Sequence, residues 1–246
     1  SRELSVSGST QEYYHLQESM DFEPDIPDLC RELEQGYDFL ILCNPNNPTS
    51  SAISKKDLRD LIHFCEEKDI FVMIDETYVE FAPDISAITA VPLTQEFTNL
   101  MVLRGVSKFF AAPGMRLGYG ITGNKKFLEK MREKQTPWSL NSIGAFAGEI
   151  MLQDEEYIQQ TRQLILSERD RMIDELKNIS TYKVYPAYAN FILLKIQKDG
   201  LTSYDVFEAC IRQGLMIRNC SSFQCLEGEF VRFCIMMPED NSRLIY

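Results

Sequence analysis

Three polar segments in this chain of 246 residues carry side chains that could do chemistry, and each follows a short apolar run. The runs and their segments are Asp38–Cys43 with NPNNPT (44–49), Ile70–Ile74 with DETY (75–78), and Leu100–Leu103 with residues 104–119. Each run has the length of a strand and lacks polar alternation, as strands covered on both faces do. The carboxyl ends of parallel strands line the ligand crevice of an open α/β sheet. We therefore expect the three segments to meet in one site.

A lysine and an aspartate in these segments predict the chemistry of that site. Lys108 lies just beyond a buried run, where loss of water frees an amine to act as a nucleophile. Such an amine forms a Schiff base with pyridoxal phosphate, an aldehyde cofactor that stabilises carbanions. This cofactor needs a protonated ring nitrogen, and a buried carboxylate placed as Asp75 is favours the charged form.

Four neighbouring residues are placed to hold the other groups of such a cofactor. Its phenolic oxygen needs hydrogen-bond partners, and Asn47 and Tyr78 are suited to that role. Its phosphate needs hydroxyls and a guanidinium, which Ser107 and Arg116 supply. Taken singly, NPNNPT could be a proline-stiffened turn, and Asp75 could be a helix cap. Their joint order and spacing favour a functional site.

The elements that position these residues follow from the hydrophobic pattern. Ser54 is suited to cap a helix whose apolar residues Leu58, Leu61, Ile62 and Cys65 share one face. Strand, helix and strand in this order form a βαβ unit, so we predict an α/β fold with a mostly parallel sheet flanked by helices. Further helices are predicted over residues 124–134, 139–152 and, from a cap at Asp154, about 154–178.

The C-terminal part has the pattern of a smaller α+β unit. Its predicted elements are a strand Asn190–Ile196, a helix Ser203–Gln213 ended by Gly214, strands Leu215–Arg218 and Phe230–Ile235, and the first turns of a helix over Pro238–Tyr246. We predict a partial large domain over residues 1–155, a connecting helix over 156–179, and a small domain over 180–246 that is incomplete at its end.

Composition narrows the function classes. The chain is 44% hydrophobic and 25% charged, which is typical of a folded globular protein. A net charge of −12 argues against nucleic acid or an anionic membrane as the main partner, and no apolar run approaches the length of a membrane helix. Two histidines exclude a His-rich metal centre, and we predict no metal site. Seven scattered cysteines and no visible signal peptide predict reduced thiols in a cytoplasmic protein.

The segments NPNNPT, DETY and SKFFAAPGMRLGY, in this order and spacing, resemble the pyridoxal-phosphate aminotransferases of class I/II, a fold-type-I family. Within it, the chain is most similar to histidinol-phosphate aminotransferase and threonine-phosphate decarboxylase. The stretches KFFAAPGMRLGY, PWSLN and IRNCSSF look nearer to the decarboxylase branch. The resemblance runs from about Asp38 to the end. It implies a homodimer with the active site at the interface.

The resemblance also implies roles for individual residues. Lys108 would carry the cofactor and move the proton at Cα, which agrees with the chemistry of the residues themselves. Arg232 matches the substrate-anion arginine of the family, and Arg218 matches a second anion-binding arginine of the branches with phosphorylated substrates. Two arginines suit a dianion such as a phosphate monoester. A strand arginine is also often structural, and that alternative stays open for both.

The chain departs from the family's pattern at three points. Ser50 stands where a glycine usually follows NPNNPT, so a positive φ there would be strained. Gly105 stands where a hydroxyl residue often precedes the lysine by three positions, which removes one phosphate ligand. The small-residue phosphate loop and the ring-stacking aromatic of the family are not recognisable in residues 1–37. We therefore interpret the chain as a fragment.

Three functions follow as hypotheses. The first is transamination of a small, anionic, phosphorylated amino compound through a Lys108 Schiff base, with a keto acid as co-substrate. The second is decarboxylation of an amino acid phosphate with the same residues. The third is an inactive fragment or scaffold that lacks the first part of the cofactor site. The candidate residues are Lys108, Asp75 and Tyr78 for catalysis, these with Asn47, Ser107 and Arg116 for the cofactor, and Arg232 and Arg218 for the substrate.

Overall fold

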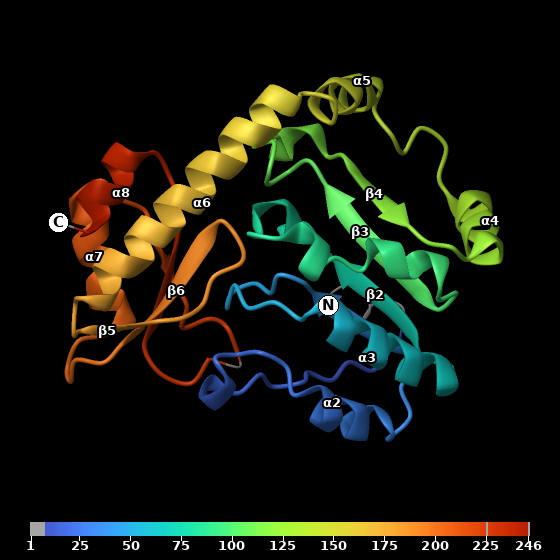
Figure 1. Ribbon diagram of the computed structural model, residues 1–246, viewed down its shortest axis with the longest axis horizontal. Coiled ribbons are helices and arrows are strands. Elements are labelled where there is room, and N and C mark those ends of the chain that lie inside the picture. Colours follow the sequence, from blue (N-terminus) through green and yellow to red (C-terminus); the bar gives the residue numbers. More distant parts are fainter. Residues whose placement is uncertain (1–7, 225, 246) are drawn as a thin grey trace.

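The structure is a computed structural model that describes residues 8–224 and 226–245. In that part of the chain, two four-stranded sheets are joined by a long helix, α6 (Figure 1). The helices are α2 (Ile26–Leu33), α3 (Lys55–Glu67), α4 (Lys125–Lys134), α5 (Ser142–Met151), α6 (Glu155–Lys177), α7 (Ser203–Arg212) and α8 (Pro238–Ile245). Short 3-10 helices are η1 (Glu18–Met20), η2 (Val79–Phe81), η3 (Ile85–Ala87), η4 (Val91–Gln95) and η5 (Pro113–Met115).

Sheet A contains the three strands that were predicted and one that was not. Its order is β1 (Phe39–Cys43), β2 (Phe71–Asp75), β3 (Leu100–Gly105) and β4 (Gly118–Ile121). The first three strands are parallel, which confirms the mostly parallel sheet, and β4 runs antiparallel to β3. The sequence pattern does not reveal β4, because its four residues include two glycines, which weaken a strand.

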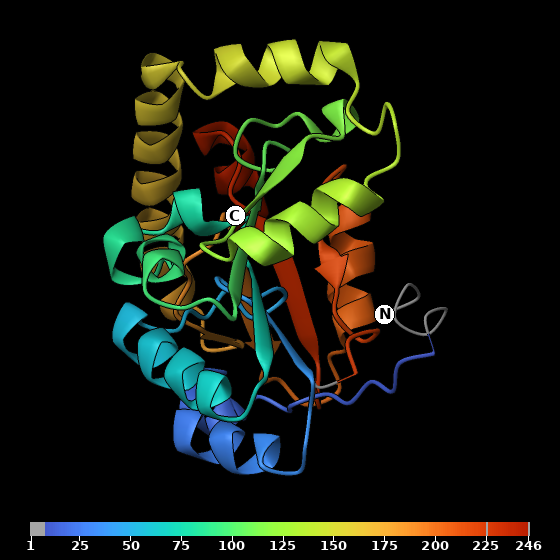
Figure 2. The same cartoon turned by 90° about the vertical axis from the view of Figure 1, so that its right-hand side faces the viewer.

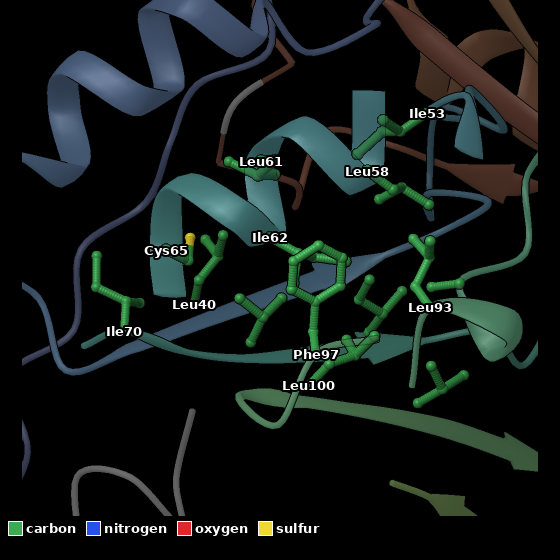
Figure 3. Packing of buried hydrophobic residues seen from close by; sticks show 14 of the residues in the cluster. Leu40, Ile53, Leu58, Leu61, Ile62, Cys65, Ile70, Leu93, Phe97 and Leu100 are labelled. Atoms are coloured by element: carbon green, nitrogen blue, oxygen red, sulfur yellow. The ribbon is translucent and has the colours of Figure 1, made fainter. Parts of the chain in front are cut away.

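The helix α3 connects β1 to β2 and covers one face of sheet A. Its N-terminus is capped as predicted, because the Ser54 hydroxyl accepts a hydrogen bond from the Asp57 N–H at 3.1 Å. The apolar stripe of α3 is fully buried against the sheet, and α2 packs against α3 (Figure 3). The labelled residues of this core are Leu40, Ile53, Leu58, Leu61, Ile62, Cys65, Ile70, Leu93, Phe97 and Leu100. Burial of this stripe holds the helix on the sheet.

The opposite face of sheet A is only partly covered within the described residues. Phe39 and Ile41 of β1 are exposed there. Helix α4 lies in front of the strands in Figure 2 and reaches them through Phe127, whose ring centre is 4.7 Å from that of Phe71. Asp75 lies on this same face as Phe71, because alternate residues of a strand share a side.

The long helix α6 runs from α5 to sheet B (Figure 1). It begins at the predicted cap, where the Asp154 carboxylate accepts from the Tyr157 N–H at 3.0 Å. Arg162 and Arg169, seven residues apart, hydrogen-bond to main-chain carbonyl oxygens in and after η2. The helix is therefore attached to the segment that follows β2 as well as to sheet B, which it contacts through β5 and β6.

Sheet B is antiparallel throughout, with the order β5 (Tyr182–Val184), β6 (Phe191–Ile196), β8 (Phe230–Cys234) and β7 (Arg218–Asn219). The predicted helix Ser203–Gln213 is confirmed as α7, which a capping box of Thr202 and Asp205 starts. The predicted strand Leu215–Arg218 is wrong in extent, because only Arg218–Asn219 pairs with β8. The strand β5 was not predicted, because three residues are too few to show the alternation of apolar and polar residues that is typical of a strand.

An N-terminal segment is anchored on sheet B before it reaches α2. Phe22 is buried against the rings of Tyr185 and Phe230, whose centres lie 5.1 and 5.9 Å away. Glu18 accepts hydrogen bonds from the Tyr185 hydroxyl at 2.7 Å and from Lys195 Nζ at 2.6 Å, and these partners lower the pKa of the Glu18 carboxyl against an opposing effect of burial. Both sheets are thus tied to residues 8–37 as well as to α6.

Two classes of site find no support in the described residues. None of the helices there combines the length and apolar composition needed to cross a membrane. Nor do His, Cys, Asp and Glu side chains gather there in a group of three or more that could hold a metal ion.

Candidate active site

The carboxyl ends of β1, β2 and β3 meet at one edge of sheet A, and Asp75 lies at its centre. Asp75 is paired with Cys43 on one side and with Leu103 on the other. The Asn44 N–H donates to the Asp75 carbonyl oxygen at 2.9 Å, and the Glu76 N–H donates to that of Leu103 at 2.9 Å. The three polar segments therefore begin side by side, as the parallel sheet predicts.

The Asp75 carboxylate is oriented by the turn that follows it. The Thr77 N–H donates to Oδ1 at 2.9 Å, and the Thr77 hydroxyl donates to the same atom. No side chain or backbone group in residues 8–224 or 226–245 donates to Oδ2. One oxygen is thus fixed by the protein while the other is available as an acceptor for an N–H group in the crevice.

The segment after β1 folds into a compact loop with a polar tip. Asn44 is fully buried, donates to the carbonyl oxygens of Ile53 and Ile88, and accepts from the Ile53 N–H at 2.8 Å. Both Asn–Pro peptide bonds of the loop are cis. These contacts hold the loop against the residue before the α3 cap and against the end of η3, and they leave Asn47 exposed at its tip.

Five side chains from five segments form a continuous chain of contacts that joins the two sheets. Lys108 Nζ lies 5.6 Å from the centre of the Tyr78 ring. The Tyr78 ring meets the Phe191 ring edge-on at 5.2 Å, and the Arg232 guanidinium carbon lies 4.6 Å from the centre of the Phe191 ring. Arg232 Nη1 donates to Asn47 Oδ1. We call these five residues the contact chain; four were predicted site residues, and the sequence analysis did not single out Phe191.

Lys108 does not have the desolvated surroundings that the sequence suggested. Strand β3 ends at Gly105, and the lysine lies three residues later in a turn closed by the Ala111 N–H and the Lys108 carbonyl oxygen at 3.0 Å. Its side chain is exposed, because the neighbouring face of sheet A is only partly covered. No ion pair joins Lys108 to Asp75, both of which the structure describes. The amine and the carboxylate therefore make no direct ionic contact.

Ser107 lies in the turn that follows β3, and Arg116 lies just before β4. The β3–β4 ladder ends with the pair Gly105–Gly118. Beyond it the Val106 N–H donates to the Leu117 carbonyl oxygen at 3.3 Å, next to Ser107 on one side and Arg116 on the other, and Arg116 has a left-handed φ of 50°. The Arg116 side chain is exposed and donates to the Pro113 carbonyl oxygen at 3.1 Å. The predicted phosphate ligands therefore each adjoin the last bond of the hairpin, and the Arg116 guanidinium binds its own turn.

Both single-residue departures noted in the sequence have a structural consequence. Ser50 has a φ of 62°, so the positive backbone angle is present without the glycine that tolerates it best. A Cβ at Gly105 would lie 3.1 Å from the carbonyl oxygen of Leu117. The hairpin therefore leaves little room for a hydroxyl side chain at position 105.

Arg218 and Arg232 are direct cross-strand partners in β7 and β8. Like charges opposite each other destabilise a sheet, so this pair suits a site that receives an anion. Arg232 Nε is buried and has no hydrogen-bond partner among the described residues. Burial raises the pKa of the nearby Cys220 thiol to about 11, and both arginines act in the opposite direction. The geometry thus presents two cations on one face of sheet B.

The family model described as aminotransferase class I and II matches residues 1–246. The chain belongs to this family. Its enzymes depend on pyridoxal phosphate. The residues on this edge fit that cofactor, because Asp75 Oδ2 is available to a ring N–H, and Tyr78 and Asn47 lie on either side of the Phe191–Arg232 contact.

Individual members of the aminotransferase family resemble the chain over nearly its full length. A Caldanaerobacter subterraneus protein, named provisionally as a threonine-phosphate decarboxylase, is 36% identical over 244 residues, which are 99% of this chain and 65% of that protein. A histidinol-phosphate aminotransferase of Methanococcus aeolicus is 30% identical over 240 residues, 98% of this chain and 63% of that protein. The chain spans slightly less than two thirds of the length of these curated relatives.

A solved structure of the same family shares the fold. The histidinol-phosphate aminotransferase from Clostridium acetobutylicum matches with a TM-score of 0.92 at 31% identity, over 99% of this chain and 72% of that one. The predicted α/β fold is therefore confirmed.

The candidate site has two neighbours that the sequence analysis did not single out. Glu76 is 0% exposed and accepts from Arg104 Nη2 at 2.8 Å and Nε at 3.1 Å. It also accepts from the hydroxyl of Thr89. This buried ion pair links the ends of β2 and β3. A signal for it exists in DETY, because the acid next to Asp75 must point to the opposite, covered face of the sheet.

Glu80 is a second buried acid beside this pair, two residues after Tyr78. Burial raises the pKa of Glu80 to about 7; the negative charge of Glu76 adds to the effect, and Arg104 and Arg162 oppose it. Its Oε2 atom is buried without a hydrogen-bond partner among the described residues. Glu80 therefore stays largely protonated under mildly acidic conditions.

The free energy of unfolding is expected to fall by up to about 3 kcal/mol through Glu80 alone as the pH rises from 4.5 to 7. The folded-state pKa is raised, so in this window the native state keeps a proton that the unfolded state has released. The free energy of unfolding therefore declines as the pH rises toward 7, and the decline levels off above pH 7. Thermal unfolding of wild type and Glu80→Gln at pH 5 and 7.5 measures the difference. Glu66→Gln, on the exposed side of α3, is the control. An unchanged pH dependence in Glu80→Gln would contradict the assignment.

Proposed function

We propose that the protein carrying this chain is a pyridoxal-phosphate-dependent aminotransferase for a small, phosphorylated amino compound, with a keto acid as co-substrate. The contact chain carries the proposal, because it links the amine of Lys108 on the sheet A side to the paired arginines of sheet B. Family membership supports it, and the names of the relatives include a phosphorylated amino compound in each branch.

The residues of the site would divide the task of holding the cofactor. Asp75 would accept the ring N–H and favour its charged form, and Tyr78 and Asn47 would bond the phenolic oxygen. Ser107 and Arg116 would bind the phosphate, which requires Arg116 to leave its own turn. Pyridoxal phosphate itself supplies an aldehyde that links to amines and a ring that stabilises negative charge at the substrate Cα.

Lys108 would act first as the amine that anchors the aldehyde and then as the base that moves the proton at Cα. The Tyr78 ring below its ammonium group restricts where that group can lie. Arg232 and Arg218 would bind the anionic end of the substrate, and Asn47 orients Arg232.

A decarboxylase for an amino acid phosphate is the second candidate. The relative at 36% identity favours it, since its name belongs to that class. The same side chains would serve both reactions. The outcome depends on which bond of Cα is held perpendicular to the cofactor ring, where the electrons of the breaking bond enter the ring system.

The two candidates differ in their products and in their need for a keto acid. The complete protein, with pyridoxal phosphate, is incubated with histidinol phosphate or threonine phosphate, with and without 2-oxoglutarate. We expect the phosphorylated amino compound to be consumed only when the keto acid is present, and without release of carbon dioxide. Carbon dioxide released without a keto acid would establish the decarboxylase instead. A complete protein that binds no cofactor and forms neither product would identify the inactive scaffold.

Removal of the arginine pair is expected to weaken substrate binding specifically. Arg232→Gln should raise KM for the phosphorylated substrate about 30–150-fold, because a charge-assisted hydrogen bond to an anion contributes about 2–3 kcal/mol. Arg218→Gln should act in the same direction and more weakly, because its side chain is more exposed. Steady-state kinetics measures both, and Arg212→Gln, an exposed arginine of α7, is the control. An unchanged KM in Arg232→Gln would contradict the substrate-binding role and favour a structural role for this arginine.

We also infer that the complete protein is a homodimer in the cytoplasm. Helix α5 and the loop before it carry exposed apolar side chains, of which Trp138, Ile143 and Phe146 are 97%, 72% and 66% exposed. An apolar patch of this kind is typical of an interaction surface. Analytical ultracentrifugation of the complete protein tests the inference, and a monomer at micromolar concentration would contradict it.

A further inference from the structure

Ser50 and Arg169 hold the backbone of one residue, Ala189, in the segment that enters sheet B. Ser50 Oγ accepts from the Ala189 N–H at 2.9 Å and from the Tyr188 N–H at 3.1 Å. Arg169 Nη1 donates to the Ala189 carbonyl oxygen at 3.0 Å and to that of Phe81 at 2.9 Å. Both polar groups of Ala189 therefore have fixed partners outside sheet B. We call Ser50 and Arg169 the Ala189 clamp.

The clamp is maintained despite two unfavourable local features. Ser50 is 0% exposed and has a φ of 62°, which strains a residue with a Cβ. Arg169 is 1% exposed, and both of its hydrogen-bond partners are carbonyl oxygens. Burial of a guanidinium without a carboxylate is unfavourable, and it lowers the pKa of Arg169. Two such features at one peptide indicate that the position of this peptide matters.

The three segments that the clamp joins each carry a member of the contact chain. The pairs are Ser50 after Asn47, Phe81 after Tyr78, and Ala189 before Phe191. Phe191 in turn contacts Arg232, the arginine that donates to Asn47. A shift of Ala189 would therefore move the Phe191 ring relative to Tyr78 and change the position of Arg232.

We propose that Ser50 and Arg169 are positioning residues that set Arg232 against the sheet A side of the site and thereby determine affinity for the anionic substrate. This rests on the proposed function. The hydroxyl arm of the clamp is a feature of this chain, because the family usually has glycine at position 50. Neither residue touches the reacting atoms; both act through the peptide that leads into β6.

Two variants of the complete holoenzyme separate the hydroxyl from the strain. Ser50→Ala and Ser50→Gly both remove Oγ, but only glycine relieves the positive φ, so Ser50→Gly is expected to have the higher Tm of the two. Hydrogen exchange at the Ala189 amide should accelerate at least about 10-fold in both. KM for the phosphorylated substrate should rise about 10-fold in both, with kcat and bound cofactor within about twofold of wild type.

Further variants complete the test. Arg169→Lys should keep a hydrogen bond to one of the two carbonyl oxygens, so its KM should lie between those of wild type and Arg169→Met. Ser86→Ala, which removes an exposed hydroxyl that bonds only Asp84, is the control and should change neither exchange at Ala189 nor KM.

The outcomes distinguish the clamp from the proposed function. Unchanged exchange at Ala189 in both Ser50 variants would overturn the clamp. Faster exchange with an unchanged KM would overturn its positioning role, and so would a KM that rises only in the less stable Ser50→Ala. Absence of any reaction in wild type would refute the proposed function, while the exchange measurement still tests the clamp.

Discussion

Replacement of Lys108 by alanine in the complete protein is expected to lower turnover by at least about four orders of magnitude. In the proposed function one amine would both anchor the cofactor and move the proton at the substrate Cα, so its loss would remove two steps at once. The side chain is exposed and contacts Tyr78, so the fold should survive. Steady-state turnover and the Tm of the variant measure the two effects separately.

The control for this prediction is Lys56→Ala, an exposed lysine on α3, which should retain full turnover. Borohydride treatment of the wild-type holoenzyme followed by peptide mass spectrometry should locate the cofactor on Lys108. A small primary amine added to Lys108→Ala should restore part of the activity, because it replaces the missing base. A labelled lysine other than Lys108 would refute the assignment.

Replacement of Asp75 by asparagine is expected to lower kcat by about 10²–10³-fold. The amide oxygen can still accept from Thr77, so the turn after β2 should keep its shape. Its other group is an N–H₂ donor where the carboxylate offered Oδ2, so it cannot favour a protonated ring nitrogen. The ring held by the variant would therefore withdraw electrons from the substrate Cα less strongly.

A cofactor analogue with a methylated ring nitrogen distinguishes this explanation from a general loss of structure. The analogue carries a fixed positive charge, so it should restore activity to Asp75→Asn relative to the unmodified cofactor. Asp60→Asn, an exposed residue of α3, is the matched control and should leave kcat unchanged. A variant that binds cofactor and turns over normally would show that Asp75 does not set the charge of the ring.

The strands and helices that could be predicted from the sequence are those with a continuous apolar run or a helix cap. β1, β2, β3, α3 and α6 all have one or the other, and the caps at Ser54 and Asp154 are confirmed. β4 and β5 could not be predicted, because four and three residues are too few to show alternation. The division into two domains at residues 155 and 179 stays a prediction.

The candidate site was accessible from the sequence because its residues follow strand ends, where motif and topology agree. Asn47, Tyr78, Lys108 and Arg232 lie in one chain of contacts, although their catalytic roles remain proposals. The environment was less accessible, as the exposure of Lys108 shows. Burial depends on what covers a sheet, and the spacing of residues within a strand does not report that.

The buried charges around Glu76 and Glu80 show a second limit. An isolated acid in a sequence is usually exposed. Arg104 lies 28 residues from Glu76, and Arg162 lies 82 residues from Glu80, whose main-chain carbonyl oxygen it binds. Such pairings depend on the packing of distant segments, so no local pattern announces them. The sequence indicates only that Glu76 lies on the opposite sheet face from Asp75, because adjacent residues of a strand point to opposite faces.

The two arginines of α6 that reach the segment after β2 make the length of that helix as important as its composition. A helix turns by about 100° per residue, so seven residues bring Arg162 and Arg169 back to nearly the same side. A single residue inserted between them would rotate one guanidinium away from its carbonyl oxygens. The spacing of seven residues between the two arginines therefore has to be kept. In related sequences, substitutions between these positions should be frequent, whereas insertions and deletions should be rare.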